Sequence, residues 1–146
     1  MMAIGQPYGL RAIRLPSEPF GASWRAGRAG FARRLANDLL LRPMIVSGRH
    51  RLERAGIAAN DHLFGMNDGG AMDRARLLGI FRNLPDGVSE LCCHPATGPW
   101  PEMEPAARRF RVADELAALI DPRVRVALSD LGIERTVFSE LSSARG

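Results

Sequence analysis

The chain of 146 residues contains no lysine, so all 20 of its basic residues are arginines. The total absence of one basic residue type indicates a coding bias rather than a surface selected for charge, and it weakens the inference that a pI of about 10.3 would otherwise allow. The arginines are scattered along the chain, whereas specific nucleic-acid binders gather theirs in one patch. With a net charge of only +4, we expect no nucleic-acid partner.

Cysteine is also scarce, since Cys92 and Cys93 are the two in the chain and they are adjacent. Neighbouring residues of a strand point to opposite faces, so a disulfide between them would be strained. No CxxC pair is present, which excludes a cysteine framework of the usual spacing. The simplest expectation is a reduced, cytoplasmic chain.

Long apolar runs are missing as well. No stretch approaches the roughly 20 apolar residues that a membrane-spanning helix needs, and the N-terminus lacks the basic and apolar segments of a secretory signal. A hydrophobic content of 46% is still sufficient for a packed core. The length predicts a single domain over residues 1–146.

The most informative stretch is residues 84–97, which read Leu-Pro-Asp-Gly-Val-Ser-Glu-Leu-Cys-Cys-His-Pro-Ala-Thr. A Pro-Asp-Gly turn signal precedes a short apolar run, Val88–Cys93, that predicts a buried strand. Alternation places Glu90, Cys92 and His94 on one face. A histidine at the exit of a buried strand is where α/β enzymes place catalytic groups, but the pattern alone equally allows a histidine that only caps the strand.

Three other strands are expected, at Ala12–Leu15, at His62–Phe64 within residues 57–65, and at Thr136–Phe138. Helical spacing of apolar residues predicts helices between them, while the Gly- and Ala-rich residues 22–30 are only a weak helix candidate. The predicted helices are Phe31 to the residue before Pro43, Pro43–Ala55, Ala71–Asn83, Val112–Ile120, and a helix from Pro122 that ends at Gly132. This alternation predicts an α/β fold with a parallel sheet and right-handed crossovers, and four strands fit half of a (β/α) barrel.

The same spacing predicts which side chains these helices bury. For the helix that starts at Phe31 they are Phe31, Leu35, Leu39 and Leu40; for the helix after Ala71 they are Met72, Leu77, Leu78, Ile80 and Phe81; for the last two they are Leu116, Leu119, Val124, Ala127, Leu128 and Leu131.

Other polar residues carry weaker signals. Arg14 lies near a strand end and Glu18 in the loop beyond it, and the two are compatible with a structural ion pair. In a half-barrel, Glu90, on the same face as His94, would lie inside the barrel and need a partner, for which a barrel-facing Arg14 is a candidate. His50, among three arginines, is expected on the surface.

Two loops remain. Asp68-Gly69-Gly70 is compatible with phosphate binding, but a tight turn or a close backbone approach explains two glycines equally well. The proline-rich loop at 97–110 is either a substrate-binding loop or an insertion.

The 84–97 stretch resembles the LPxGxxE…HPA signature of YdjC-like carbohydrate deacetylases. Within that family, the stretch is more similar to the hopanoid-associated HpnK branch. Three further stretches agree with that branch, and they extend the resemblance over nearly the whole chain in the same order. They are residues 8–19 (YGLRAIRLPSEP), residues 60–65 (NDHLFG) with 70–72 (GAM), and residues 115–122 (ELAALIDP).

The resemblance implies a distorted (β/α) barrel roughly twice as long as this chain. Such enzymes remove an N-acetyl group from an amino sugar with one divalent metal, which an Asp-Asp motif and a His-rich motif of the N-terminal half bind. This sequence contains neither an Asp-Asp pair nor HxH. It therefore resembles only the C-terminal half, no metal ligand is assigned to it, and we expect no metal in the chain alone.

The resemblance also gives roles to residues of this half. His94 is expected to donate a proton to the leaving amine, because imidazole titrates near neutral pH. Arg14, Glu18 and Glu90 are expected to orient groups or hold sugar hydroxyls, and Trp100 either stacks on a sugar ring or covers the core. The implied partners are an amino-sugar or glycolipid substrate and a chain that supplies the N-terminal half, or a homo-oligomer.

Two functions of different classes remain open. The chain is either the C-terminal part of a sugar deacetylase, inactive alone, or a non-catalytic module that binds a sugar or a partner. A reading frame with the Asp-Asp and His-rich motifs directly upstream of Met1 would favour the first, and unrelated DNA there would favour the second.

Overall fold

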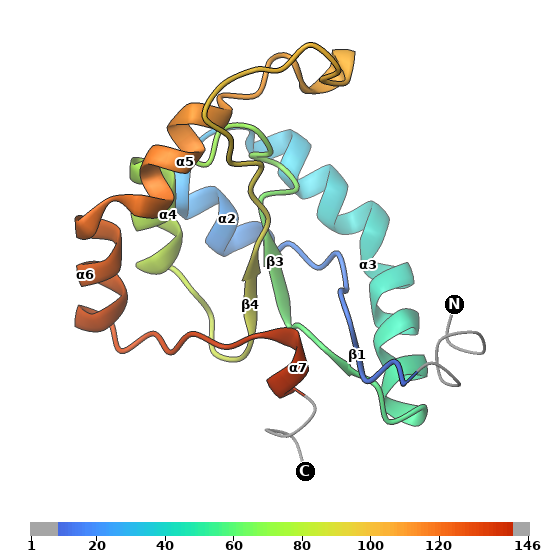
Figure 1. Ribbon diagram of the computed structural model, residues 1–146. Coiled ribbons are helices and arrows are strands. Elements are labelled where there is room, and N and C mark those ends of the chain that lie inside the picture. Colours follow the sequence, from blue (N-terminus) through green and yellow to red (C-terminus); the bar gives the residue numbers. More distant parts are fainter. Residues whose placement is uncertain (1–8, 142–146) are drawn as a thin grey trace.

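The computed structural model describes residues 9–141, so that Tyr8, the first residue of one motif, lies outside it (Figure 1). The described part is a mixed α/β structure with two small parallel sheets. In one, β1 (Ala12–Ile13) pairs with β2 (Ala58–Ala59); in the other, β3 (His62–Phe64) pairs with β4 (Ser89–Leu91). The predicted parallel arrangement is confirmed in two small sheets rather than one; β3 lies at the predicted His62–Phe64, and β4 is shorter than the predicted Val88–Cys93.

Asn60 connects the two sheets. This fully buried side chain accepts a hydrogen bond from Leu15 N at 2.7 Å and donates to the carbonyl oxygens of Leu15 and His62, each at 2.9 Å. Beyond it, Leu63 N donates to Ser17 O at 2.8 Å. The chain after β1 therefore continues alongside β3, and one amide side chain replaces the backbone pairing at the point where the ladder is interrupted.

Helices fill the connections between the strands. Figure 1 shows α3 on one side of the strands and α4, α5 and α6 on the other. The helices are α2 (Phe20–Gly27), α3 (Phe31–Arg54), α4 (Arg74–Phe81), α5 (Val112–Ile120), α6 (Pro122–Asp130) and α7 (Phe138–Leu141), with a 3-10 turn at Pro105–Ala107. No helix within residues 9–141 is both long enough and apolar enough to cross a membrane.

The structure corrects the prediction for α3. A single helix runs through Pro43, where two helices were predicted. Pro43 lacks an N–H, so the carbonyl of Leu39 loses its helical donor, but both residues are exposed and water can replace it.

The prediction of which face of this helix is buried is also wrong. Phe31, Leu39 and Leu40 are exposed, whereas Arg34 and Leu52 are buried. The helix is rotated relative to its apolar pattern because Arg34 takes part in a buried ion-pair cluster, described below. An apolar stripe (Leu39, Leu40, Met44 and Val46), each member more than half exposed, is left facing outward.

The main core lies between β3 and the helices α2, α4, α5 and α6. Its fully buried members include Phe64, Met72 and Leu77, and the burial predicted for Met72, Leu77, Ile80 and Phe81 is confirmed. A second cluster of Leu15, Leu52, Ile57 and Ala59 packs β1 and β2 against α3.

Helix α4 starts later than predicted, because Asp73 caps it by accepting a hydrogen bond from Arg76 N at 2.9 Å. Arg111 also donates to Asp73, at 3.0 Å. Burial works to raise the pKa of Asp73, but the hydrogen bonds from Arg76 and Arg111 outweigh it and hold the pKa below its ordinary value of 3.8.

The C-terminal helices confirm part of the pattern, since Val124, Ala127 and Leu128 pack against the core as predicted. Asp121 separates α5 from α6 and caps α6 through Arg123 N, and Gly132 follows with a positive φ of 62°. Leu119 and Leu131, predicted to pack, are instead exposed. On α5 the buried positions are Val112, Glu115 and Ala118, one step around the helix from the predicted face.

Residues 136–138 do not form the predicted strand. The Thr136 hydroxyl donates to Glu140 Oε2 at 2.9 Å, and Phe138 begins α7, which contacts β1. Local side-chain hydrogen bonds of this kind compete with strand pairing, and an apolar triplet has no periodicity that could reveal them.

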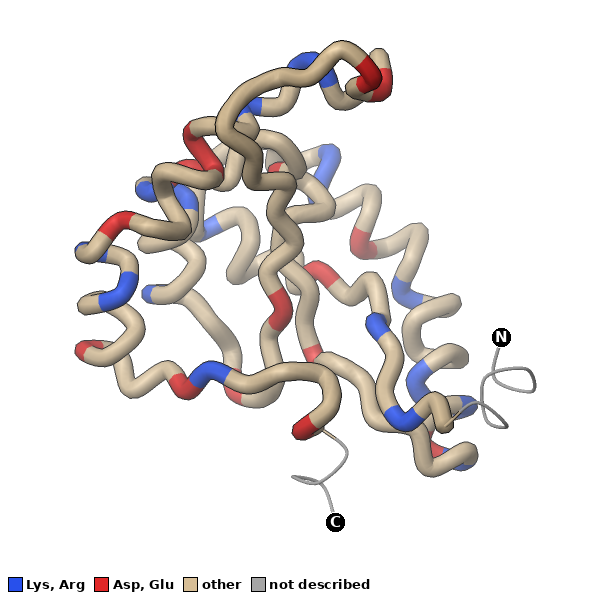
Figure 2. The backbone as a smooth tube through the Cα atoms, viewed as in Figure 1, with Lys and Arg blue, Asp and Glu red and all other residues tan. Residues whose placement is uncertain are grey.

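The charged residues are spread over the helices and loops rather than gathered in one patch (Figure 2). This distribution agrees with the expectation drawn from the scattered arginines. The absence of a nucleic-acid partner stays a prediction.

Candidate functional site

Arg14 and His94 follow β1 and β4, respectively. Both strands run parallel to the segment that contains β2 and β3. The carboxyl ends of parallel strands meet at one edge of a sheet, which is where α/β proteins build their sites. β1 and β4 belong to different two-stranded sheets, so Arg14 and His94 follow the carboxyl ends of two sheets and do not share one edge.

Glu90 on β4 has the partner proposed from the sequence. Its Oε1 accepts a hydrogen bond from Arg14 Nε at 2.7 Å and another from Nη2 of the same guanidinium. The Glu90 side chain is 15% exposed and that of Arg14 is 52% exposed, so the carboxylate is mostly covered while part of the guanidinium reaches solvent. The hydrogen bond with Glu90 raises the pKa of Arg14.

The sequence allowed an ion pair between Glu18 and Arg14, but in the structure each pairs with another residue. It is buried, and its Oε1 lies 3.3 Å from Arg34 Nη1 and accepts from the Ser23 hydroxyl. Its Oε2 accepts from Asn67 N at 2.9 Å. The structure thus places Glu18 where it anchors the loop after β3, and its role toward a substrate stays a prediction.

Glu18 belongs to an ion-pair cluster (Glu18, Arg34, Asp68 and Arg76, with Ser23) whose members are buried, apart from Arg76, whose side chain is 15% exposed. Asp68 Oδ1 lies 2.6 Å from Arg34 Nη2 and 3.2 Å from Arg76 Nη2. Together these contacts hold the loop at 65–70 against α2 and α3. Asp68, considered for phosphate binding, is therefore committed to two arginines.

His94 combines exposure with a buried acidic neighbour. Its side chain is 44% exposed, its Nδ1 lies 4.0 Å from Glu115 Oε2, and its backbone N donates to the same oxygen at 2.5 Å. The ring centroid of Phe110 lies 4.8 Å from that of His94, in a tilted arrangement. A partly exposed imidazole held in this way can exchange a proton with a bound molecule.

Glu115 is the site residue that sequence reasoning missed. It is fully buried, although it is charged and lies on a short helix. The signal was present, because Val112, Glu115 and Ala118 recur at a spacing of three and share one face of α5. A carboxylate in the middle of an apolar helix face is rarely buried without a purpose.

The glycines at 69 and 70 allow a close approach rather than cradling a phosphate. Gly70 has a φ of 77°, and a Cβ there would lie 2.2 Å from the ring of Phe110. A Cβ at Gly69 would lie 3.8 Å from His94 Cε1. The loop can therefore pass directly beneath the His94–Phe110 pair.

Trp100 lies on the long loop after β4 and is 47% exposed. Its carbonyl accepts from Met103 N at 3.0 Å, and the buried Met103 fixes this part of the loop. Much of the indole is accessible, so the loop shows an aromatic face to solvent.

Both cysteines are free thiols, as predicted. Burial raises the pKa of Cys93 to about 11, and the nearby Glu115 carboxylate and Cys92 add to the effect. The Cys93 thiol therefore stays protonated near neutral pH and is a poor nucleophile.

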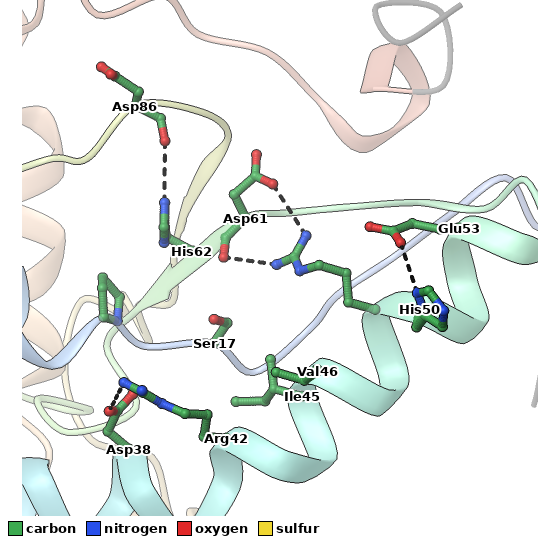
Figure 3. Close-up of a pocket in the computed structure, with 12 residues that line it drawn as sticks. Ser17, Asp38, Arg42, Ile45, Val46, His50, Glu53, Asp61, His62 and Asp86 are labelled. Carbon is green, nitrogen blue, oxygen red and sulfur yellow. Dashed lines mark hydrogen bonds and ion pairs between the residues drawn. The ribbon is translucent and has the colours of Figure 1, made fainter.

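A cavity of about 720 Å³ lies apart from the candidate site, between α3 and the start of β3 (Figure 3). Several of its charged lining residues are paired with one another, as in Arg49–Asp61 at 3.2 Å and Arg42–Asp38 at 2.8 Å. His62 Nε2 lies 3.3 Å from the Asp86 carbonyl oxygen. Arg14, Glu18, Glu90, His94 and Trp100 are not among its lining residues, so the cavity and the candidate site are different places.

His50, at the far end of this cavity, is largely exposed on α3, as predicted. Across residues 9–141, no three or more His, Cys, Asp and Glu side chains converge closely enough to hold a metal ion. The described residues therefore do not fit the divalent metal that the resemblance implies.

Comparison with known proteins gives one match. Residues 1–130 match the model of the family described as YdjC-like protein. No curated protein and no solved structure matches the chain.

Proposed function

Because the chain belongs to the YdjC-like family, whose membership indicates a function of the carbohydrate-deacetylase type, we propose that it is the C-terminal portion of a carbohydrate N-deacetylase. The complete enzyme would hydrolyse the N-acetyl group of an amino sugar, and an amino-sugar glycolipid of hopanoid biosynthesis is the substrate we favour. The observation that carries the proposal is the partly exposed His94 at the carboxyl end of β4, backed by a buried carboxylate.

In the proposed reaction, the oxygen of a water molecule bonds to the acetyl carbon while that water gives a proton to a base that the N-terminal half would supply; the carbon–nitrogen bond then breaks, and acetate and an amine leave. The amine nitrogen needs a proton as it departs, and His94 is placed to donate it. Arg14, anchored by Glu90, keeps part of its guanidinium in solvent and is suited to hold a sugar hydroxyl or a carboxylate. Trp100 is suited to stack on the sugar ring.

The rest of the enzyme would lie outside these 146 residues. We assign the divalent metal of the complete enzyme to that other part, because residues 9–141 do not assemble a set of ligands. The apolar stripe of α3 supports a protein partner, since exposed apolar surface of this kind marks interaction sites. On this proposal the present chain is half of a (β/α) barrel and is inactive alone.

The test measures acetate release from N-acetylated amino sugars by the purified chain, with and without a family member's N-terminal half. We expect activity only with both parts, and His94→Ala should lower it by roughly 10²- to 10⁴-fold, as expected for loss of a general acid. His50→Ala is the matched control, because His50 is an exposed histidine on α3 away from the site.

Acetate release by the chain alone would refute the proposal that the active site is divided between this chain and an N-terminal half. Full activity of His94→Ala in the reconstituted enzyme would remove His94 from the reaction. The α3 stripe also suits a non-catalytic partner-binding module, and partner binding by α3 without any acetate release would favour that second function.

A further inference from the structure

The buried carboxylate of Glu115 is unusual among the acidic groups of this chain. It is fully buried, and within residues 9–141 it forms no ion pair with an arginine; its Oε2 lies 4.0 Å from Nδ1 of His94, a contact that is an ion pair when the His94 ring is protonated. Burying a carboxylate without a cation costs free energy. A positive charge or an N–H on the His94 ring would offset part of that cost.

Two backbone donors hold this carboxylate in place. Met72 N donates to Oε1 at 3.0 Å from the segment before α4, and His94 N donates to Oε2 at 2.5 Å from the segment after β4. Because the donors come from two different segments, the carboxylate cannot rotate away from His94 without losing a buried hydrogen bond.

The ring of His94 is restrained on two sides. Nδ1 lies 4.0 Å from Glu115 Oε2, and Phe110 packs against the ring. A carboxylate can only accept a hydrogen bond, so it favours a proton on the nitrogen that faces it. Free imidazole in water prefers the other neutral tautomer, with its proton on Nε2.

We propose that Glu115 is a positioning residue that keeps a proton on Nδ1 of His94 and reserves Nε2 for the substrate. The assignment of Nε2 to a substrate rests on the proposed function, but the contact with Glu115 does not. In the reaction, doubly protonated His94 gives its Nε2 proton to the leaving amine. The remaining Nδ1 proton stays directed at Glu115, so the ring ends neutral and correctly oriented.

Nuclear magnetic resonance of the intact chain tests this directly, because the sequence contains only three histidines. Long-range ¹H–¹⁵N spectra at alkaline pH distinguish the two neutral tautomers, and His94→Gln assigns the signals. We expect a protonated Nδ1 and an unprotonated Nε2 for His94 in the wild-type chain. The reverse pattern would overturn the proposal, whatever becomes of any variant.

Glu115→Gln provides the second arm. Its spectrum should show His94 shifted towards the Nε2–H tautomer, and an unchanged tautomer in a folded variant would exclude Glu115 as the cause. Asp114→Asn is the matched control, because it removes an exposed carboxylate from the neighbouring position on α5 and should leave His94 unaffected. If Glu115→Gln does not fold, the wild-type tautomer still decides.

In the reconstituted enzyme, Glu115→Gln should lower kcat by roughly 10- to 100-fold with little change in KM. Adding Glu115→Gln to His94→Ala should cost little more than His94→Ala alone, because the two residues act as a unit. An Nδ1–H tautomer without acetate release would leave the positioning role intact and refute the proposed function. Acetate release with the Nε2–H tautomer would do the opposite.

Discussion

Replacing Arg34 with methionine should destabilise the chain more than its place on a largely exposed helix suggests. The Arg34 side chain is 1% exposed and donates to four groups, the Ala29 carbonyl, the Ser23 hydroxyl, Glu18 Oε1 and Asp68 Oδ1. Methionine keeps much of the volume and the helical preference but none of these hydrogen bonds.

The magnitude follows from what the two carboxylates retain. Each lost charged hydrogen bond contributes about 1.5–3 kcal/mol, so the two bonds to carboxylates account for about 3–6 kcal/mol. In the variant, Asp68 still pairs with Arg76, and Glu18 still accepts hydrogen bonds from the Ser23 hydroxyl and the Asn67 backbone N–H. These contacts offset part of the loss. We expect a decrease in the free energy of unfolding of about 3–5 kcal/mol, the usual cost of removing one partner of a buried ion pair.

The assay is urea unfolding followed by far-ultraviolet circular dichroism. Arg42→Met is the matched control, because Arg42 is on the same helix and pairs with Asp38 at 2.8 Å, but in solvent. The control should lose no more than about 0.5 kcal/mol. Equal losses for Arg34→Met and Arg42→Met would refute the buried cluster.

Three further outcomes are expected. Asp73→Ala should lower the free energy of unfolding by about 1 kcal/mol at neutral pH. Since the pKa of Asp73 is lowered in the fold, that difference is present above pH 3.8 and should vanish in acid titrations below it. In a Cys92→Ser variant, Cys93 should react slowly with iodoacetamide at about pH 8 and faster towards pH 11, as followed by mass spectrometry. Gly79→Ala should destabilise α4 by about 1–3 kcal/mol in urea unfolding, because its Cβ would lie 2.3 Å from Ala26 O, even though alanine favours helices.

Each of these has a contradicting result. A pH-independent effect of Asp73→Ala would mean that only the cap matters and not the charge. Rapid alkylation of Cys93 near neutral pH in the folded chain would contradict its burial. A stabilised Gly79→Ala would show that the helix can move away from α2.

The sequence was sufficient where a local pattern decides the structure. Turn residues followed by a short apolar run predicted β4, and strand alternation placed Glu90 on the face where Arg14 meets it. The order of strands and helices predicted parallel pairing, because short crossovers leave few other arrangements.

It was insufficient where tertiary charge pairing decides. A hydrophobic pattern predicts that Arg34 and Glu115 are exposed because both are polar. In the structure both are buried, with hydrogen-bond partners that are distant in sequence. The rotation of α3 and the contact between His94 and Glu115 both follow from such pairs, which the periodicity of a single sequence cannot predict. The missing strand at 136–138 has a different origin, because the local hydrogen bond between Thr136 and Glu140 is not visible in a pattern of three residues.

Asn60 has a consequence for the substitutions that this chain can accept. One side chain supplies an acceptor to Leu15 N and two donors to the carbonyls of Leu15 and His62, in a fully buried position. Aspartate has the same shape but no donors, serine has too few, and glutamine is one methylene too long. The most conservative replacement by size, Asn60→Asp, would thus turn lone pairs against two carbonyl oxygens and rank among the worst tolerated. In a saturation-mutagenesis screen for folded chain, this position between β2 and β3 should accept no substitute, whereas exposed positions on α3 such as Leu40 should accept many.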